Sequence, residues 1–140
     1  TLTGRPHMRP HLALLSALAL ATPLFAADTP LTADAFDAAT VGKTFFYQRG
    51  GLSYGAEQYL PDHKVVWAFT GDDCKKGYWY SRGTLICFIY EDKLDPQCWT
   101  FTQTADGLSA RFDGDTANEP LVALRSSPEP MACMGPDVGA

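Results

Sequence analysis

Four cysteines carry the most reactive side chains of this 140-residue chain, and they are Cys74, Cys87, Cys98 and Cys133. Their spacings of 13, 11 and 35 residues include no C-x-x-C pair. Zinc ligands usually come as such close pairs, and thiol catalysis needs a base beside a cysteine of low pKa. The even number and the wide spacing therefore favour two disulfide bonds.

Strand register predicts which cysteines pair. The apolar segments around them suit a hairpin whose four-residue loop runs from Glu91 to Leu94. Facing residues of an antiparallel pair have numbers of constant sum, so Cys87 would face Cys98 at a distance that a disulfide can bridge. This pairing leaves Cys74 and Cys133 to fix the C-terminal tail to the sheet.

Groups suited to acid–base or nucleophilic catalysis are few. His63 is the one histidine beyond residue 27, and it lies in a predicted polar turn. The acidic pairs Asp72–Asp73 and Glu91–Asp92 could act as paired carboxylates or bind Ca²⁺, but neither matches a calcium loop, and solvated turn charges are the commoner case. No hydrolase or nucleotide-binding motif is present. We therefore expect no catalytic residue, no metal and no cofactor.

Aromatic side chains could instead bind a ligand. The candidates are Trp67, Tyr78, Trp79, Tyr80 and Trp99, all on predicted strands. Alternation along a strand places Tyr78 and Tyr80 on one face and Trp79 on the other. These rings would line a pocket if the inside of the sheet had spare room. The short chain favours the alternative, a small barrel that its own side chains fill.

The N-terminal segment predicts export. The basic stretch Met8–His11 precedes an apolar run over residues 12–21, and small residues lead up to Ala27. These are the parts of a bacterial secretory signal peptide, and the residues before Met8 would lie upstream of it. The run is too short to span a bilayer, and Pro23 follows it closely. We expect cleavage near Ala26 or Ala27 and a periplasmic or secreted protein that does not insert in the membrane.

Beyond residues 1–27, we predict one domain over residues 28–125. A short helix would begin at Thr32 as N-cap and end before Gly42, with Ala35, Phe36 and Ala39 facing the domain. The hydrophobic pattern then changes to a period of two. We predict strands near residues 44–48, 54–60, 64–69, 77–82, 84–90, 97–102, 108–112 and 120–125.

Short connections between successive strands predict an up-and-down antiparallel meander. The expected fold is mainly β: about eight strands that form a small lipocalin-like or split barrel, with one short N-terminal helix. Residues 126–140 contain three prolines and would form an irregular tail held by Cys133.

Composition restricts the partners. The chain has 46% hydrophobic and 19% charged residues, as expected of a folded domain, and a net charge of −5. An acidic chain argues against nucleic acid and anionic membrane surfaces, which attract Lys and Arg patches. We expect a monomer that binds a small molecule or a protein of the cell envelope.

The segments Gly77-Tyr-Trp79, Ile86-Cys-Phe-Ile-Tyr90 and Cys98-Trp99 give a pattern G-x-W, I-C-F-x-Y and C-W. With these segments the chain resembles a family of small exported bacterial proteins of unknown function. The resemblance implies export and a compact β shape, and it supplies no catalytic residue.

Three functions are compatible with these features. The first is a non-catalytic periplasmic accessory module that binds a small ligand or a partner. The second is an inhibitor-like protein whose acidic loops, Asp72–Asp73 and Glu91–Asp92, bind a cationic envelope enzyme. The third and least favoured is a hydrolase that uses paired carboxylates.

Overall fold

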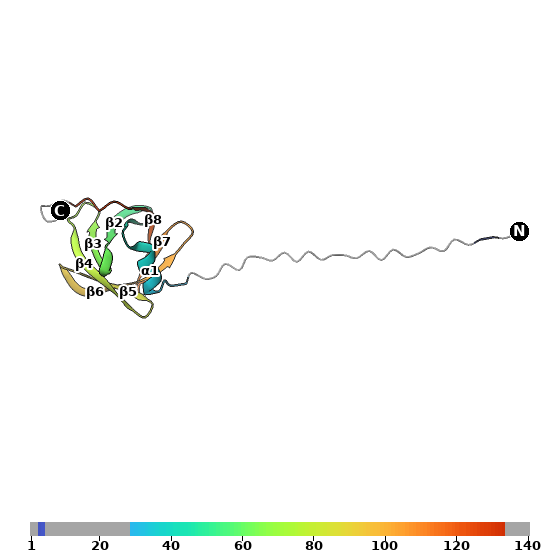
Figure 1. Cartoon of the computed structure of the whole chain (residues 1–140), viewed down its shortest axis with the longest axis horizontal. Helices are drawn as coiled ribbons and strands as arrows, with labels where there is room; N and C mark the ends of the chain where they lie inside the picture. The colour runs from blue at the N-terminus through green and yellow to red at the C-terminus, as the bar shows by residue number, and fades with distance from the viewer. Residues whose placement is uncertain (1–2, 5–28, 134–140) are drawn as a thin grey trace.

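The computed structural model describes residues 3–4 and 29–133 (Figure 1). The predicted signal peptide with its cleavage site, and the tail beyond Cys133, lie outside the described residues. In the described part, eight antiparallel strands form a closed barrel in sequence order, and one short α-helix precedes them. The predicted fold class, a mainly β up-and-down barrel with one helix, is confirmed.

Every predicted strand corresponds to an observed one. Their bounds are β1 Thr44–Arg49, β2 Leu52–Tyr59, β3 Lys64–Phe69, β4 Lys75–Arg82, β5 Leu85–Tyr90, β6 Lys93–Gln103, β7 Leu108–Phe112 and β8 Leu121–Ser127. A 3-10 turn, η1 Pro61–His63, connects β2 to β3. Antiparallel pairing of β1 with β8 closes the sheet, so the barrel has no unpaired edge.

Helix α1, Ala33–Thr40, begins and ends at the predicted residues. The Thr32 hydroxyl accepts a hydrogen bond from the Ala35 backbone N–H at 3.2 Å, and Gly42 follows the helix with a φ of +78°. The prediction that Ala35 faces the domain is wrong, since Ala35 is exposed and Ala39 is only half-buried. Thr40 is buried instead, and its hydroxyl donates to the Phe36 carbonyl at 2.8 Å.

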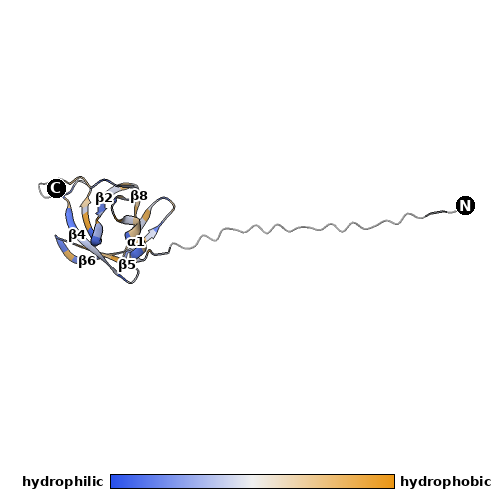
Figure 2. Cartoon of the chain, in the orientation of Figure 1, coloured by the Kyte–Doolittle hydropathy of each residue, from blue (hydrophilic) through white to orange (hydrophobic). Residues whose placement is uncertain are grey.

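Phe36 fills the barrel at the end that α1 covers. Its side chain is 0% exposed, and its ring contacts four other rings with centroid separations of 4.6 to 6.4 Å. These rings belong to Tyr59, Trp79, Phe88 and Phe101, which point inward from β2, β4, β5 and β6. In Figure 2, apolar and polar residues mix along the strands, as expected when one side of each strand faces the core.

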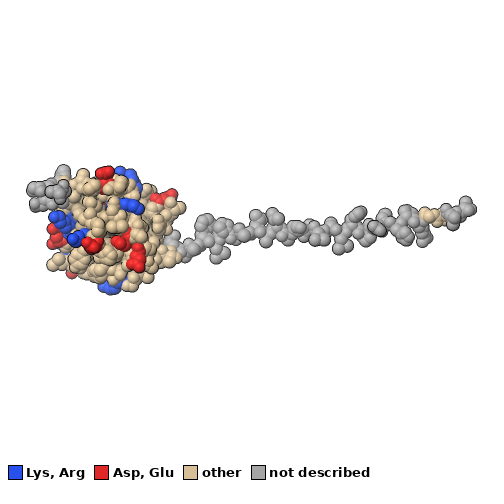
Figure 3. All heavy atoms as spheres, in the orientation of Figure 1, with Lys and Arg blue, Asp and Glu red and all other residues tan. Residues whose placement is uncertain are grey.

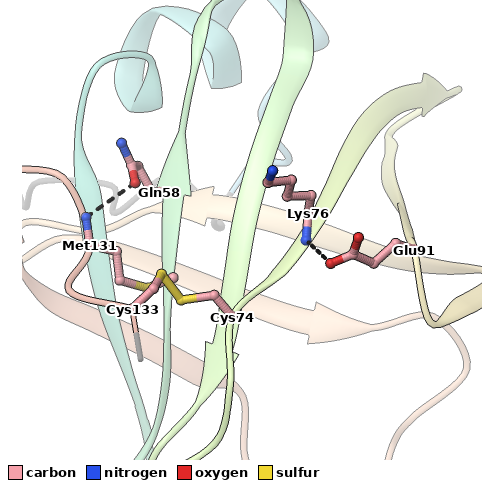
Figure 4. Close-up of a disulfide and its surroundings, with 6 residues drawn as sticks. All are labelled: Gln58, Cys74, Lys76, Glu91, Met131 and Cys133. Atoms are coloured by element: carbon pink, nitrogen blue, oxygen red, sulfur yellow. Dashed lines mark hydrogen bonds between the residues drawn. A yellow bond between two sulfur atoms is a disulfide. The ribbon is translucent and has the colours of Figure 1, made fainter. Parts of the chain in front are cut away.

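Two disulfide bonds join Cys87 to Cys98 and Cys74 to Cys133, the connectivity that strand register predicts. Cys87 faces Cys98 across β5 and β6. Cys74, which precedes β4, holds the C-terminal segment against the barrel (Figure 4). In the same segment the Met131 backbone N–H donates to the Gln58 side chain at 3.1 Å.

The predicted four-residue loop between β5 and β6 is wrong. Tyr90 pairs with Lys93, so Glu91 and Asp92 alone form the turn. The register shifts between Phe88 and Tyr90, opposite Pro96, which has no N–H to donate and is tolerated where ladder pairing is irregular. At the other end of the domain, β8 runs to Ser127, two residues into the predicted tail.

We predict that Phe36→Ala lowers the free energy of unfolding by about 3–5 kcal/mol, because it removes a fully buried ring from a cluster that cannot close around the space. Phe36→Leu should cost about 1–2 kcal/mol, which keeps the comparison measurable if the alanine variant fails to fold. Urea unfolding measures both. Leu52→Ala, at a side chain 75% exposed, is the control and should change stability by less than about 0.5 kcal/mol. Equal losses for Phe36→Ala and Leu52→Ala would contradict the role given to Phe36.

We also predict unequal losses when either disulfide is replaced by two alanines. The Cys74–Cys133 bond joins residues 59 apart and the Cys87–Cys98 bond residues 11 apart. Loop-closure entropy of the unfolded chain then gives losses of about 4 and about 3 kcal/mol respectively. Denaturant unfolding of the two variants under oxidising conditions tests the order. A larger loss from the Cys87–Cys98 pair would show that packing around that bond outweighs chain entropy.

Candidate functional site

A cavity of about 330 Å³ lies in the half of the barrel that Phe36 does not fill. Its opening is bordered by the β3–β4 connection and the β5–β6 turn, which are at the end of the barrel away from α1. Its floor includes Phe88 and Phe101, the same rings that contact Phe36 from the other side. The expectation of a barrel filled throughout is therefore wrong for this half.

Strand alternation supplies the walls of the cavity. Inward positions on β1, β2, β3, β5 and β6 bring large aromatic side chains to one space, namely Tyr47, Tyr59, Trp67, Tyr90 and Trp99. Tyr54 also lines this space, from the point on β2 where the β1–β2 register shifts. Gly55 makes room for one of these rings. A Cβ atom at position 55 would lie 2.6 Å from the Trp67 ring, so only glycine lets the indole lie across β2.

Glu57 is the one acidic side chain inside this aromatic lining, and it is only 2% exposed. The Tyr90 hydroxyl lies 3.1 Å from both carboxyl oxygens, so it donates to either one. In the described part of the chain no Lys, Arg or His forms an ion pair with Glu57. Burial raises the pKa of Glu57 well above its usual 4.5, and the Tyr90 hydrogen bond offsets this only in part. Burial therefore favours the protonated, neutral form of this carboxyl group.

Two further hydroxyl groups lie beside the carboxyl group. The Tyr47 and Tyr59 hydroxyls are 2.8 Å apart and share a hydrogen bond. Burial raises the pKa of Tyr47, Tyr59 and Tyr90, so all three stay protonated. The cavity thus brings one carboxyl and three phenol groups together around Glu57, and its lining also includes the Tyr54 phenol and the Gln97 amide.

Charged side chains surround the mouth of the cavity. They are Asp72, Asp73 and Asp92 together with Lys75 and Lys93, and the Lys75 ammonium lies 3.7 Å from the Asp92 carboxylate. Glu91 is not part of this group, because its carboxylate accepts a hydrogen bond from the Lys76 backbone N–H at 3.0 Å (Figure 4). Three of the four predicted acidic residues therefore meet at one rim, where lysines accompany them.

The five aromatic residues proposed from the sequence fall in different places. Trp67 and Trp99 line the cavity. Trp79 points inward but packs against Phe36 and is 2% exposed, with the predicted turn residue His63 stacked on it at a centroid distance of 3.6 Å. Tyr78 is 50% exposed, and Tyr80 is half-buried outside the cavity lining.

Sequence reasoning missed Glu57 and the tyrosines around it. The signal was present, because Glu57 alternates in step with Gly55 and Tyr59 and so shares their inward face. Tyr90 is the last residue of β5, the strand that contains Cys87, and the predicted four-residue loop would begin directly after it. A charged residue at an inward position of a barrel strand is the pattern that identifies this site.

Comparison of the chain with protein-family models, with curated proteins and with solved structures gives no match. Within residues 3–4 and 29–133, no helix has the length and apolar character needed to cross a membrane. In the same ranges, no three His, Cys, Asp or Glu side chains converge on a position for a metal ion. The cavity itself is therefore the feature from which a function has to be argued.

We predict that Glu57 makes the protein less stable as pH rises. Its folded pKa is raised, so above about pH 4.5 the folded chain holds a proton that the unfolded chain has lost. The stability that Glu57 contributes is complete below that pH and is lost as pH rises through the folded pKa, by at most about 1.4 kcal/mol per pH unit. Glu57→Gln cannot ionise, so it should be more stable than the wild type near pH 8 but not near pH 4.

Urea unfolding at several pH values measures this difference. Glu129→Gln removes an exposed carboxylate outside the cavity and should follow the wild-type pH profile. Parallel profiles for the wild type and Glu57→Gln would show that Glu57 ionises alike in the folded and unfolded chain.

Proposed function

We propose that this protein is a non-catalytic, exported module that binds one small, largely apolar molecule in the open half of its barrel. The observation that carries the proposal is the cavity of about 330 Å³, which has aromatic walls and four polar groups near its floor. Cavities that bind small molecules have about 300–1,000 Å³, mostly apolar walls and a few convergent polar groups.

The groups around Glu57 support a non-catalytic role. A nucleophile needs an adjacent base, and the tyrosine hydroxyls near Glu57 have raised pKa values. Glu57 shares its hydrogen bond with a tyrosine rather than with a second carboxyl group. This arrangement suits orientation of a ligand more than bond cleavage.

The two disulfide bonds support the export that the proposal includes. Two disulfides brace the barrel and hold its C-terminal segment, and such bonds persist in oxidising compartments. An exported barrel with an apolar cavity is suited to hold a sparingly soluble molecule outside the cytoplasm. The resemblance to small exported bacterial proteins agrees with this location.

The inhibitor-like alternative has less support. Figure 3 shows basic and acidic side chains interspersed over the visible face, without an extended patch of either sign. At the mouth of the cavity, Lys75 and Lys93 accompany the acidic residues. A surface that attracts a cationic enzyme would need a larger excess of negative charge.

The neutral fluorophore N-phenyl-1-naphthylamine tests the proposed function. We expect saturable binding with enhanced emission, and quenching of tryptophan emission because Trp67 and Trp99 line the cavity. Ala110→Leu, which projects a larger side chain into the cavity, should weaken binding at least about tenfold, the equivalent of about 1.4 kcal/mol.

Ala56→Leu is the matched control. Ala56 alternates with Glu57 and lies on the outer face of β2, so the variant should bind like the wild type. Thermal melts verify that both variants fold. Equal binding by both variants would place the probe outside the barrel and contradict the proposal.

A further inference from the structure

Glu57 is a buried acid that has no charged partner within the described part of the chain. The residue is 2% exposed, and its carboxyl group has Tyr90 as its only hydrogen-bond partner there. An apolar side chain would fill this position at lower cost, because an unpaired buried carboxylate is strongly unfavourable. In its ionised form the Glu57 carboxylate has no cation among the described residues to compensate its charge.

The groups that face Glu57 from neighbouring elements cannot supply a positive charge. On β1 the cross-strand partner of Glu57 is Phe45, and Tyr47 is the next inward residue of that strand. Trp67 is its partner on β3, and Tyr90 reaches it from β5. On β2 itself, Tyr59 is the nearest inward residue toward α1. All of these side chains are uncharged at neutral pH. The described side chains around Glu57 therefore include no cation, and a ligand could supply one.

The walls and the mouth also favour a positive charge. Aromatic faces attract cations, and in this barrel the Tyr54 ring already holds the Arg49 guanidinium 5.0 Å from its centroid. At the mouth, three carboxylates outnumber two lysines, and one of these lysines is paired with Asp92. A negatively charged ligand would meet this excess of carboxylates at the rim.

We propose that the ligand is an organic ammonium ion, whose charged group contacts Glu57 while its apolar part lies between the aromatic walls. This inference rests on the proposed function, since it names the class of molecule that the same cavity takes. The N–H groups of the ammonium donate to the carboxylate, and the hydrogen bond from Tyr90 stays in place.

Binding then exchanges one positive charge for another. In the empty cavity burial favours the protonated form of Glu57, and the ammonium ion enters already carrying its own proton. The Glu57 proton leaves for solvent as the ammonium–carboxylate pair forms, and no bond of the ligand changes. The reaction is written as an ammonium ion plus a carboxylic acid giving an ion pair plus H⁺, so affinity rises with pH until Glu57 is ionised without ligand.

Phenethylamine and 2-phenylethanol test this inference, because they differ in an ammonium against a hydroxyl group. By calorimetry near pH 7.5, we expect the ammonium compound to bind at least about tenfold more tightly than the alcohol. Titrations in phosphate and in Tris, whose ionisation enthalpies differ, should show release of about one proton per ammonium bound. Lowering the pH should weaken ammonium binding by up to about tenfold per unit while alcohol binding stays constant.

In Glu57→Gln the ratio of the affinities for the ammonium compound and the alcohol should fall to about one, and proton release should disappear, because glutamine keeps the shape but not the charge. Glu129→Gln, which removes an exposed carboxylate away from the cavity, should keep both effects. If Glu57→Gln retains the preference, the selection belongs to the rim carboxylates and the role of Glu57 is refuted. If that variant does not fold, proton release by the wild type decides the question.

The neutral fluorophore separates the two proposals. Fluorophore binding together with equal affinity for the two phenyl compounds and no proton release would overturn the ammonium inference and leave the binding function standing. Absence of binding by the fluorophore and by both phenyl compounds would overturn both proposals.

Discussion

The contact of Phe36 with the inward rings of the barrel is the interaction on which the rest of the structure depends. An eight-stranded barrel has an interior just wide enough for its own side chains to fill. Here a ring from outside the sheet enters one end and packs against Tyr59, Trp79, Phe88 and Phe101. Because α1 supplies this filling, the strand side chains near the other end are not needed to close the core. The barrel therefore has a solid half that provides stability and a hollow half that is free for a ligand.

The disulfides fix the two sides of that hollow half. Cys87–Cys98 joins the strands that carry Tyr90 and Trp99, and Cys74–Cys133 anchors the start of β4 beside the mouth. Cavity walls lack packing partners on one side, so they lose contacts that a filled core would provide. Covalent cross-links beside such walls compensate for the missing contacts by restricting the unfolded chain. The position of the bridges thus agrees with a barrel that keeps an open end in an oxidising compartment.

Most of the fold follows from local sequence signals, whereas the site does not. Thr32 and Gly42 bound the helix, the period of two gives the strands, and register gives the cysteine partners. The β5–β6 register shifts opposite the segment that contains Pro96, so the numbers of facing residues do not keep the constant sum that predicts the four-residue loop. How much of the barrel is filled depends on how far the Phe36 ring reaches along the barrel axis. This depth depends on contacts between residues that are far apart in the sequence. Trp79 and Trp99 look equivalent in the sequence, yet one packs on Phe36 and the other lines the cavity.

Burial of the Glu57 carboxyl group has a desolvation cost that lowers stability, and the proposed cationic ligand would offset part of this cost. Desolvation raises the pKa of this carboxyl group and so favours the protonated form, in which the empty protein avoids a buried negative charge but gives up the packing that an apolar residue would bring. This desolvation cost is lowest when the Glu57 carboxyl group is protonated. A cationic ligand can replace that proton without leaving a net charge in the cavity. Strained or poorly compensated groups in natural proteins concentrate at functional sites, where stability is given up for binding. A buried carboxyl group with one hydrogen-bond donor, Tyr90, and no cation beside it in the described part of the chain is such a group, and an apolar residue in its place would favour stability alone.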